Sequence, residues 1–250
     1  MENNLEDQNS DESIKAIDSR IDASTSLRRI IRAVVAQDIP ASVWEKASVE
    51  LKLLADLLDR ETGDGAALRI RMGGIENMED GPIFLTSPVS GPANPISPPI
   101  KWWPEEGTNT IRGSGVFDDQ HEGPPTCAHG GMIALAFDEL LGAANIRAGH
   151  TGMTGTLKVI YKKPTPLHAQ IEFYGECLGK EGRKIKTVGR IEYQGQVTAE
   201  AEGIFISVEP EQFLSIAKKN VGEQAEEMLK QRWGDEAAEE VRKYKPSDLG

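Results

Sequence analysis

The sequence has few of the features that mark secreted, metal-binding or membrane-spanning proteins. Its 250 residues include only two cysteines, Cys127 and Cys177, too few for a disulfide framework, and no Cys/His cluster has zinc-site spacing. No window approaches the ~18 apolar residues that a membrane-spanning helix needs. The N-terminal sequence MENNLEDQNSDES is acidic and polar, the reverse of a signal peptide. These absences favour a cytoplasmic protein without a membrane span.

The chain also has no excess of positive charge. Its formal net charge is −12 and its sequence pI is about 4.9. Binding to nucleic acid or to an anionic membrane requires a cationic surface, so we expect neither partner. A polyanionic small ligand is not excluded, because a few Lys and Arg side chains around one opening would be enough to bind it.

Composition and periodicity divide the chain into five segments. Two apolar stripes at helical spacing, at residues 24–37 and 40–61, predict a pair of helices. Gly and Pro dominate the sequence around PVSGPANPISPPIKWWP, where Trp102 and Trp103 are expected to anchor an extended connector. The expected order is a disordered acidic tail (1–23), a helical extension (24–72), a Pro/Gly-rich connector (73–109), a regular domain (110–209) and a charged helical tail (210–250).

The regular domain is expected to be α+β. Alternating apolar residues and tight turns predict successive strands, and an apolar helix runs to about Ala148. Because that helix is apolar nearly all round, an antiparallel sheet must largely enclose it. The expected strands lie at 113–119, 153–163, 168–179, 183–193 and 197–208.

Chemistry is concentrated in residues 129–142, HGGMIALAFDELLG. Glycines at a helix start let a backbone N–H approach a ligand closely, and the helix dipole favours an anion or a developing oxyanion there. Asp138 lies among Ile133, Leu135, Phe137 and Leu141, where a lone carboxylate is costly unless it has a task. A buried acid together with a backbone donor suggests attack on an acyl carbonyl.

Four elements of the sequence together resemble the hotdog-fold thioesterases. They are HGG with an acid nine residues after the His, the MTGTL strand, the Y-x-x-P-x-P-L strand exit and the terminal AEAEGIF strand. The pattern is similar to the acyl-CoA thioesterases related to phenylacetate-pathway and THEM-type enzymes. The resemblance covers about residues 110–208 and implies an antiparallel sheet wrapped around one central helix. The helical extensions expected at both ends lie outside the resemblance.

The resemblance implies roles for individual residues. Asp138 would be the nucleophile or the general base for water, and the Gly130 N–H would polarise the thioester carbonyl. Gly131, the next residue, would lie at the substrate-binding site, where its expected contribution is to the turn and to close packing. His129 would orient the thioester or a water, or else cap the helix.

Two threonines match hydroxyl positions of the family. Thr154 matches the residue beside the acid, and Thr156, expected on the same strand face, matches a related subgroup. Thr154 is the preferred candidate, and either could be an ordinary strand residue. One departure is Gly123, which stands where some members carry an Asn, leaving water positioning to His129, a threonine or the backbone.

Binding of coenzyme A would need positive charge for its phosphates. Lys162 and Lys163 fall at a strand exit and Arg183 and Lys184 at a hairpin, where one ligand mouth could gather them or where they could be solvated surface. Cys127 and Cys177 are expected to be non-catalytic. His121, His150 and His168 have no partner spacing that suggests a metal, so no metal or other cofactor is expected.

Helix geometry argues for a site shared by two chains. Gly130 and Asp138 are eight residues apart, hence about 12 Å apart along one helix axis. That is too far for both to reach one thioester carbon, whereas two antiparallel helices at a dimer interface would bring them together. We therefore expect a homodimer or a dimer of dimers.

The sequence predicts hydrolysis of an acyl-CoA thioester to a carboxylic acid and free CoA, which is itself part of the substrate. Three alternatives stay open. A hotdog dehydratase would need a His acting with an acid in a different arrangement. A noncatalytic acyl-CoA binder or sensor would gain nothing from a buried acid. The long N-terminal helices could also make this a partner-docking protein.

Overall fold

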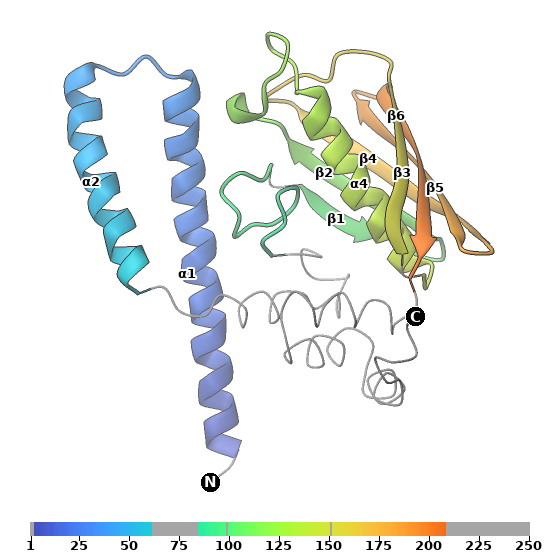
Figure 1. Ribbon diagram of the computed structural model, residues 1–250, viewed down its shortest axis with the longest axis horizontal. Coiled ribbons are helices and arrows are strands. Elements are labelled where there is room, and N and C mark those ends of the chain that lie inside the picture. The colour runs from blue at the N-terminus through green and yellow to red at the C-terminus, as the bar shows by residue number, and fades with distance from the viewer. Residues whose placement is uncertain (1–2, 62–84, 99, 151, 209–250) are drawn as a thin grey trace, which may run out of the picture.

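The protein is described here from a computed structural model, which defines residues 3–61, 85–98, 100–150 and 152–208. Two helices, α1 (Asn3–Ala36) and α2 (Ala41–Arg60), stand beside an α+β domain (Figure 1). The second predicted helix is thus found nearly to the residue. The disordered tail expected at 1–23 differs, because α1 already begins at Asn3 and continues through the first predicted helix.

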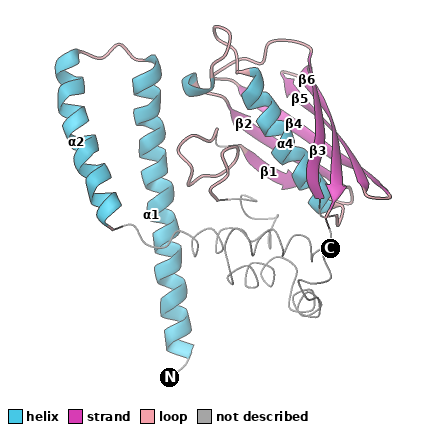
Figure 2. Ribbon diagram, in the orientation of Figure 1, coloured by secondary structure: helices cyan, strands magenta, loops and turns pink. Residues whose placement is uncertain are grey.

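The domain is built on one antiparallel sheet of six strands in the order β1-β2-β4-β5-β6-β3. A single long helix, α4 (Gly130–Arg147), lies against one face of it (Figure 2). The strands are β1 (Lys101–Pro104), β2 (Thr110–Val116), β3 (Gly152–Tyr161), β4 (Gln170–Glu181), β5 (Lys184–Tyr193) and β6 (Gln196–Ser207). The α+β prediction is confirmed, as is the sheet around one central helix.

The core forms where α4 meets the sheet. Phe137, Leu140 and Leu141 of α4 are fully buried, and so are Ile171 and Phe173 of β4. Burying one such side chain contributes about 1.5–3 kcal/mol, so this layer accounts for much of the domain's stability. Asp138 and Glu139, two polar residues in the middle of this largely apolar helix, are half-buried beside the core.

The Pro/Gly-rich connector is less extended than its composition predicts. Its last residues form β1, which pairs with β2, and residues 85–98 form a compact irregular loop. Trp102 is buried and contacts Phe173 edge to face, with ring centroids 5.3 Å apart, so it anchors the connector as expected. Trp103 is 42% exposed and does not.

One contact between α1 and the domain is made at a short 3-10 helix, η1 (Asp119–His121). Arg32 of α1 forms an ion pair with Asp119 at 2.9 Å. Within the described residues, no helix is long and apolar enough to cross a membrane. The predicted charged tail at 210–250, like residues 62–72 of the helical extension, lies outside the described residues.

Candidate active site

The first turn of α4 leaves one backbone donor unused. His129 is the N-cap: it is extended, and its Nδ1 accepts a hydrogen bond from the Gly131 N–H at 2.9 Å. Met132 and Ile133 both donate to the His129 carbonyl. Among the residues that the structure describes, the Gly130 N–H has no acceptor. It is therefore the donor of this turn that is free for a ligand oxygen, at the positive end of the helix dipole.

This geometry distinguishes the roles expected for the neighbouring residues. Gly131 uses its N–H in the cap, so its contribution is to the turn. His129 is a capping residue, one of the two functions that the sequence left open. A β-carbon added at Gly123 would lie 2.7 Å from Cα of His129, so the loop before the helix has no room for the Asn that some family members carry there.

Asp138 lies two turns further along α4 and is bonded to the predicted threonine. The Thr154 hydroxyl donates to Asp138 Oδ1 at 2.7 Å, joining the helix to the start of β3. Asp138 is half-buried in the single chain, rather than enclosed in the core as its apolar neighbours predict. Its carboxylate opens on a pocket of about 400 Å³ that Thr154 and Phe205 also line.

A β-bulge separates Thr154 from Thr156. Thr154 pairs with Phe205 and Thr156 with Ile204, so Gly155 is an extra residue in β3. Because Phe205 and Ile204 are consecutive on β6, they face opposite sides of the sheet, and the two threonines do as well. The expectation that they share one face is therefore wrong, and the bulge explains why Thr154 alone contacts Asp138.

Gly130 faces a second pocket, of about 430 Å³, distinct from that of Asp138. Tyr161, the last residue of β3, lines it and donates its hydroxyl to the Gly130 carbonyl at 2.8 Å. The sequence did not single out Tyr161. The alternation Leu157, Val159, Tyr161, which places it on the helix-facing side of β3, was the available signal. Within one chain, Gly130 and Asp138 therefore line separate pockets.

No protein-family model matches the chain. Acyl-coenzyme A thioesterase THEM4 of Mus musculus is 34% identical over 96 residues, which make up 38% of this chain and 41% of that protein. THEM4 of Xenopus laevis is 35% identical over 91 residues, 36% of this chain and 41% of that protein. A thioesterase superfamily protein of known crystal structure is 31% identical with a TM-score of 0.66, and the match covers 75% of this chain and 94% of that one.

The chain belongs to the thioesterase superfamily. Its similarity to a superfamily member over nearly all of that member's length confirms the predicted hotdog fold and the predicted family. It spans about two-fifths of the length of the curated relatives that it matches, 41% in both THEM4 proteins.

The four cationic residues predicted to bind the phosphates of coenzyme A do not lie together in this protein. Lys162 and Lys163 line the Gly130 pocket, where Lys162 pairs with Glu200 at 2.9 Å and Lys163 donates to Gln196 at 2.7 Å. Arg183 and Lys184 lie at the other end of β6, where the Arg183 carbonyl accepts from Ser207. The expectation of a single mouth lined by all four is therefore not met within one chain.

The remaining candidate groups are held in structural roles. Burial raises the pKa of the Cys177 thiol, which keeps it a thiol and a poor nucleophile. Burial lowers the pKa of His121, whose Nδ1 accepts from the Asp118 N–H while Nε2 contacts the Ile96 carbonyl at 3.2 Å. His121 is thus a neutral bracing residue.

One cluster contains side chains of the types that bind metal ions, although the sequence spacing did not indicate a metal site. Asp118, Asp119 and His168 bring their ligand atoms within 4.8 Å of one another. His168 lies 2.9 Å from Asp118 and 3.0 Å from Asp119, and Arg32 pairs with Asp119. These side chains therefore bond to one another and link α1 to the domain. His168 lies about fifty residues after the two aspartates in the chain, so sequence spacing could not indicate that the three side chains meet.

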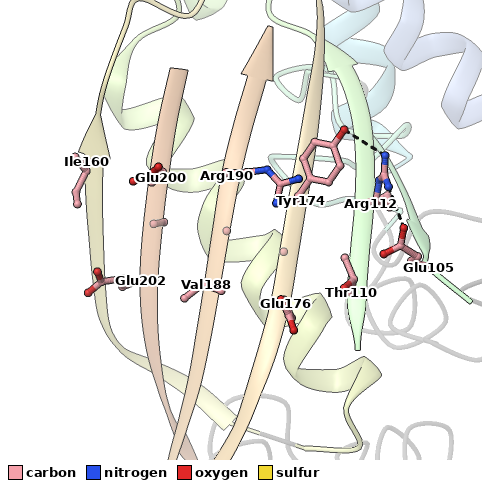
Figure 3. A pocket seen from close by; sticks show the side chains of 13 residues that line it. Glu105, Thr110, Arg112, Ile160, Tyr174, Glu176, Val188, Arg190, Glu200 and Glu202 are labelled. Carbon is pink, nitrogen blue, oxygen red and sulfur yellow. Dashed lines mark hydrogen bonds and ion pairs between the residues drawn. The ribbon is translucent and has the colours of Figure 1, made fainter. Parts of the chain in front are cut away.

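A further pocket, of about 600 Å³, lies on the sheet face opposite α4 (Figure 3). Tyr174 stands between Arg112 and Arg190, whose guanidinium carbons lie 4.3 and 4.1 Å from its ring centroid. The hydrogen bond that Tyr174 donates to Glu172, together with its partial burial, raises the pKa of its hydroxyl. This keeps the phenol protonated, and none of the predicted catalytic residues lines this pocket.

Proposed function

We propose that the protein hydrolyses an acyl-CoA thioester to a carboxylic acid and free CoA, at a site shared between two subunits. The observation that carries this proposal is the pair of complementary half-sites on α4, a free Gly130 N–H and a threonine-bonded Asp138. The curated relatives, which are named acyl-coenzyme A thioesterases, support the reaction class.

In this mechanism the Gly130 N–H donates to the thioester carbonyl oxygen, whose negative charge grows as the carbon becomes tetrahedral. Asp138 acts on the other side as general base or nucleophile. Since Thr154 occupies Oδ1, Oδ2 is the oxygen that can accept the proton of an attacking water. The C–S bond then breaks, and the CoA sulfur leaves and takes up a proton. Water is the second substrate, so we propose that no cofactor takes part.

A dimer through β3 would complete the site. β3 is the last strand of the sheet and its outer edge has no partner among the described residues. Met153 and Tyr161 of β3 are each 54% exposed in the single chain. A long open edge favours pairing with a second strand. If two β3 strands pair antiparallel, the two α4 helices also run antiparallel, and Gly130 of one chain approaches Asp138 of the other.

The test of the reaction is Asp138→Asn, which keeps the shape of the side chain and removes the base or nucleophile. We expect kcat for acyl-CoA hydrolysis to fall by on the order of 10²–10⁴ with an unchanged melting temperature. CoA release across short, medium, long and aromatic acyl-CoAs is the measurement. A variant that keeps more than about a tenth of wild-type kcat contradicts the assignment. A wild type that binds acyl-CoA without turnover would be the noncatalytic binder.

The shared site is tested by mixing two inactive variants. Gly130→Pro removes the N–H, and the extended backbone of His129 is compatible with a following proline at the first helical position. In a mixed dimer of Gly130→Pro and Asp138→Asn, one of the two sites has both wild-type groups. Equal mixing should therefore restore about a quarter of wild-type activity in a symmetric dimer. Folded, exchanging subunits that regain none would refute a two-chain site.

A further inference from the structure

Residues 85–98, named here the serine loop for its buried Ser87, Ser90 and Ser97, fold into a compact unit beside α4. The Ala93 N–H donates to the Leu85 carbonyl at 3.0 Å, and the Ser97 hydroxyl donates to the Gly91 carbonyl at 2.6 Å. A loop whose ends and interior are bonded in this way keeps one conformation despite its lack of regular structure.

One side of the serine loop is held by Glu139, the residue next to Asp138. The hydroxyls of Ser87 and Ser90 both donate to the Glu139 carboxylate. Trp102 Nε1 donates to the same carboxylate at 2.9 Å. Hydrogen bonds to a charged acceptor are about twice as strong as neutral ones. Glu139 therefore fixes the loop directly against the helix that carries Asp138.

The other side is held by Arg28 of α1. Its Nη2 donates to the carbonyls of Pro92 at 2.6 Å and Asn94 at 3.0 Å, and its Nε donates to that of Ser97 at 3.3 Å. A guanidinium presents several donors in a rigid fork, so a single side chain can satisfy several loop carbonyls at once. Figure 1 shows α1 and the loop on the same side of the domain. The N-terminal helix thereby takes part in setting the shape of the loop.

The held loop forms part of the Asp138 pocket. Pro88 and Val89 line it together with the apolar side chains of Leu135, Ile146, Met153 and Phe205. The pocket's charged lining residues are both acids, Asp138 and Glu139. Such a pocket repels the phosphates of coenzyme A and accepts an apolar group, whereas the Gly130 pocket offers Lys162 and Lys163.

We propose that the serine loop is the specificity-determining wall of the acyl pocket, with Val89 as its contact residue and Glu139 and Arg28 as positioning residues. The inference rests on the proposed function, since it assigns the acyl group to the Asp138 half-site. The size of the accepted acyl group is then set by a segment outside the sheet and depends on a contact from the N-terminal helix.

The first experiment enlarges the pocket with Val89→Ala in the full chain, and Val188→Ala on the outer sheet face is the control for the same substitution away from the pocket. Because Val89 is only 2% exposed, the melting temperature of each variant is measured alongside. CoA release is measured for acyl-CoAs of two to sixteen carbons. We expect Val89→Ala to raise kcat/KM for the bulkiest acyl groups relative to acetyl-CoA by about 10-fold, the effect of a change of one or two methyl groups in an apolar pocket. Val188→Ala should leave the ratio unchanged.

The second experiment loosens the loop with Arg28→Met, and uses Arg29→Met, an exposed neighbour on α1, as control. Arg28 does not line the Asp138 pocket, so a change in acyl preference must pass through the loop. Hydrogen exchange of residues 85–98 should increase in Arg28→Met and in Glu139→Gln. Arg28→Met should flatten the acyl-length profile through KM, with kcat for acetyl-CoA kept within about 3-fold.

The outcomes separate this inference from the proposed function. Binding of non-hydrolysable S-alkyl-CoA thioethers is measured in parallel with turnover. If no acyl-CoA is hydrolysed but Val89→Ala still shifts the preferred alkyl length, the function fails and the acyl wall stands. If hydrolysis is robust but the profile of Val89→Ala equals that of Val188→Ala, the wall is overturned. Absence of both turnover and thioether binding overturns both.

Discussion

Thr154 and Thr156 are separated by one residue, yet only Thr154 reaches Asp138. The sequence could nominate both, because strand alternation puts residues two apart on the same face. It could not predict that Gly155 forms a bulge, because a bulge is decided by pairing with β6 and not by β3 alone. The single extra residue Gly155 therefore decides that the hydroxyl of Thr154, and not that of Thr156, bonds to Asp138.

This assignment predicts different effects of the same substitution at the two positions. Thr154→Val removes a hydrogen bond to a charged group, worth about 1.5–3 kcal/mol, so kcat should fall by about 10- to 100-fold. Thr156→Val, on the other face of β3, should change kcat by less than about 2-fold. Steady-state kinetics with one acyl-CoA gives the comparison. The reverse ranking would mean that Thr156 supports the acid in the assembled protein.

The residues of α4 show what a motif reveals and what it leaves out. Asp138 and Gly130 follow from HGG and from an acid in an apolar run. The resemblance already favoured Gly130 over Gly131, and the structure supplies the physical reason, because the Gly131 N–H is bonded to His129. Glu139 was passed over because an acid beside the candidate catalytic acid reads as ordinary helix surface. Its serine and tryptophan partners lie 37 to 52 residues earlier in the chain.

At the level of secondary structure, periodicity predicted the helix α4 and five strands to within a few residues. β1 was missed because its sequence, KWWP, is short and ends in proline, and its pairing with β2 is what makes it a strand. The helical 3–23 segment was missed because its composition is polar. Local sequence therefore predicts elements with a strong apolar period, whereas elements formed through pairing need the whole fold.

Two glycines at the α4–sheet contact predict opposite changes in stability. Gly142 is inside α4, and an added β-carbon would have its nearest neighbour, Phe205 Cε1, at 3.8 Å. Gly142→Ala should therefore raise the free energy of unfolding by about 0.5–1 kcal/mol through helix propensity. At Gly175 of β4 the added carbon would lie 2.6 Å from Leu140 Cγ, so Gly175→Ala should lower it by about 1–3 kcal/mol.

Urea denaturation of both alanine variants, monitored by circular dichroism, tests this pair. The same substitution is made on two sides of one contact, so a general effect of replacing glycine would move both in the same direction. Stabilisation by Gly175→Ala would show that Leu140 has free space, contrary to the packing described above.

Across the whole molecule, contacts from two separate regions, α1 and α4, converge on the serine loop that lines the Asp138 pocket. Arg28 of α1 holds the serine loop, Glu139 of α4 holds it from the other side, and Arg32 ties α1 to η1. The groups proposed to act on the thioester, by contrast, all lie within α4 and β3. Under the proposed function, this division predicts that α1 influences which acyl group is accepted and not how the thioester is attacked.

Truncation to about residues 80–210 tests this division. Neither removed end carries a candidate nucleophile–base pair, so Asp138-dependent hydrolysis of the shortest acyl-CoA should stay detectable. Loss of the Arg28 contacts should shift the acyl-length profile in the same direction as Arg28→Met does in the full chain. Size-exclusion chromatography and the melting temperature establish that the fragment is folded and dimeric. In such a fragment, complete loss of turnover would place a catalytic group in one of the removed segments, because α4, β3 and the serine loop are all retained.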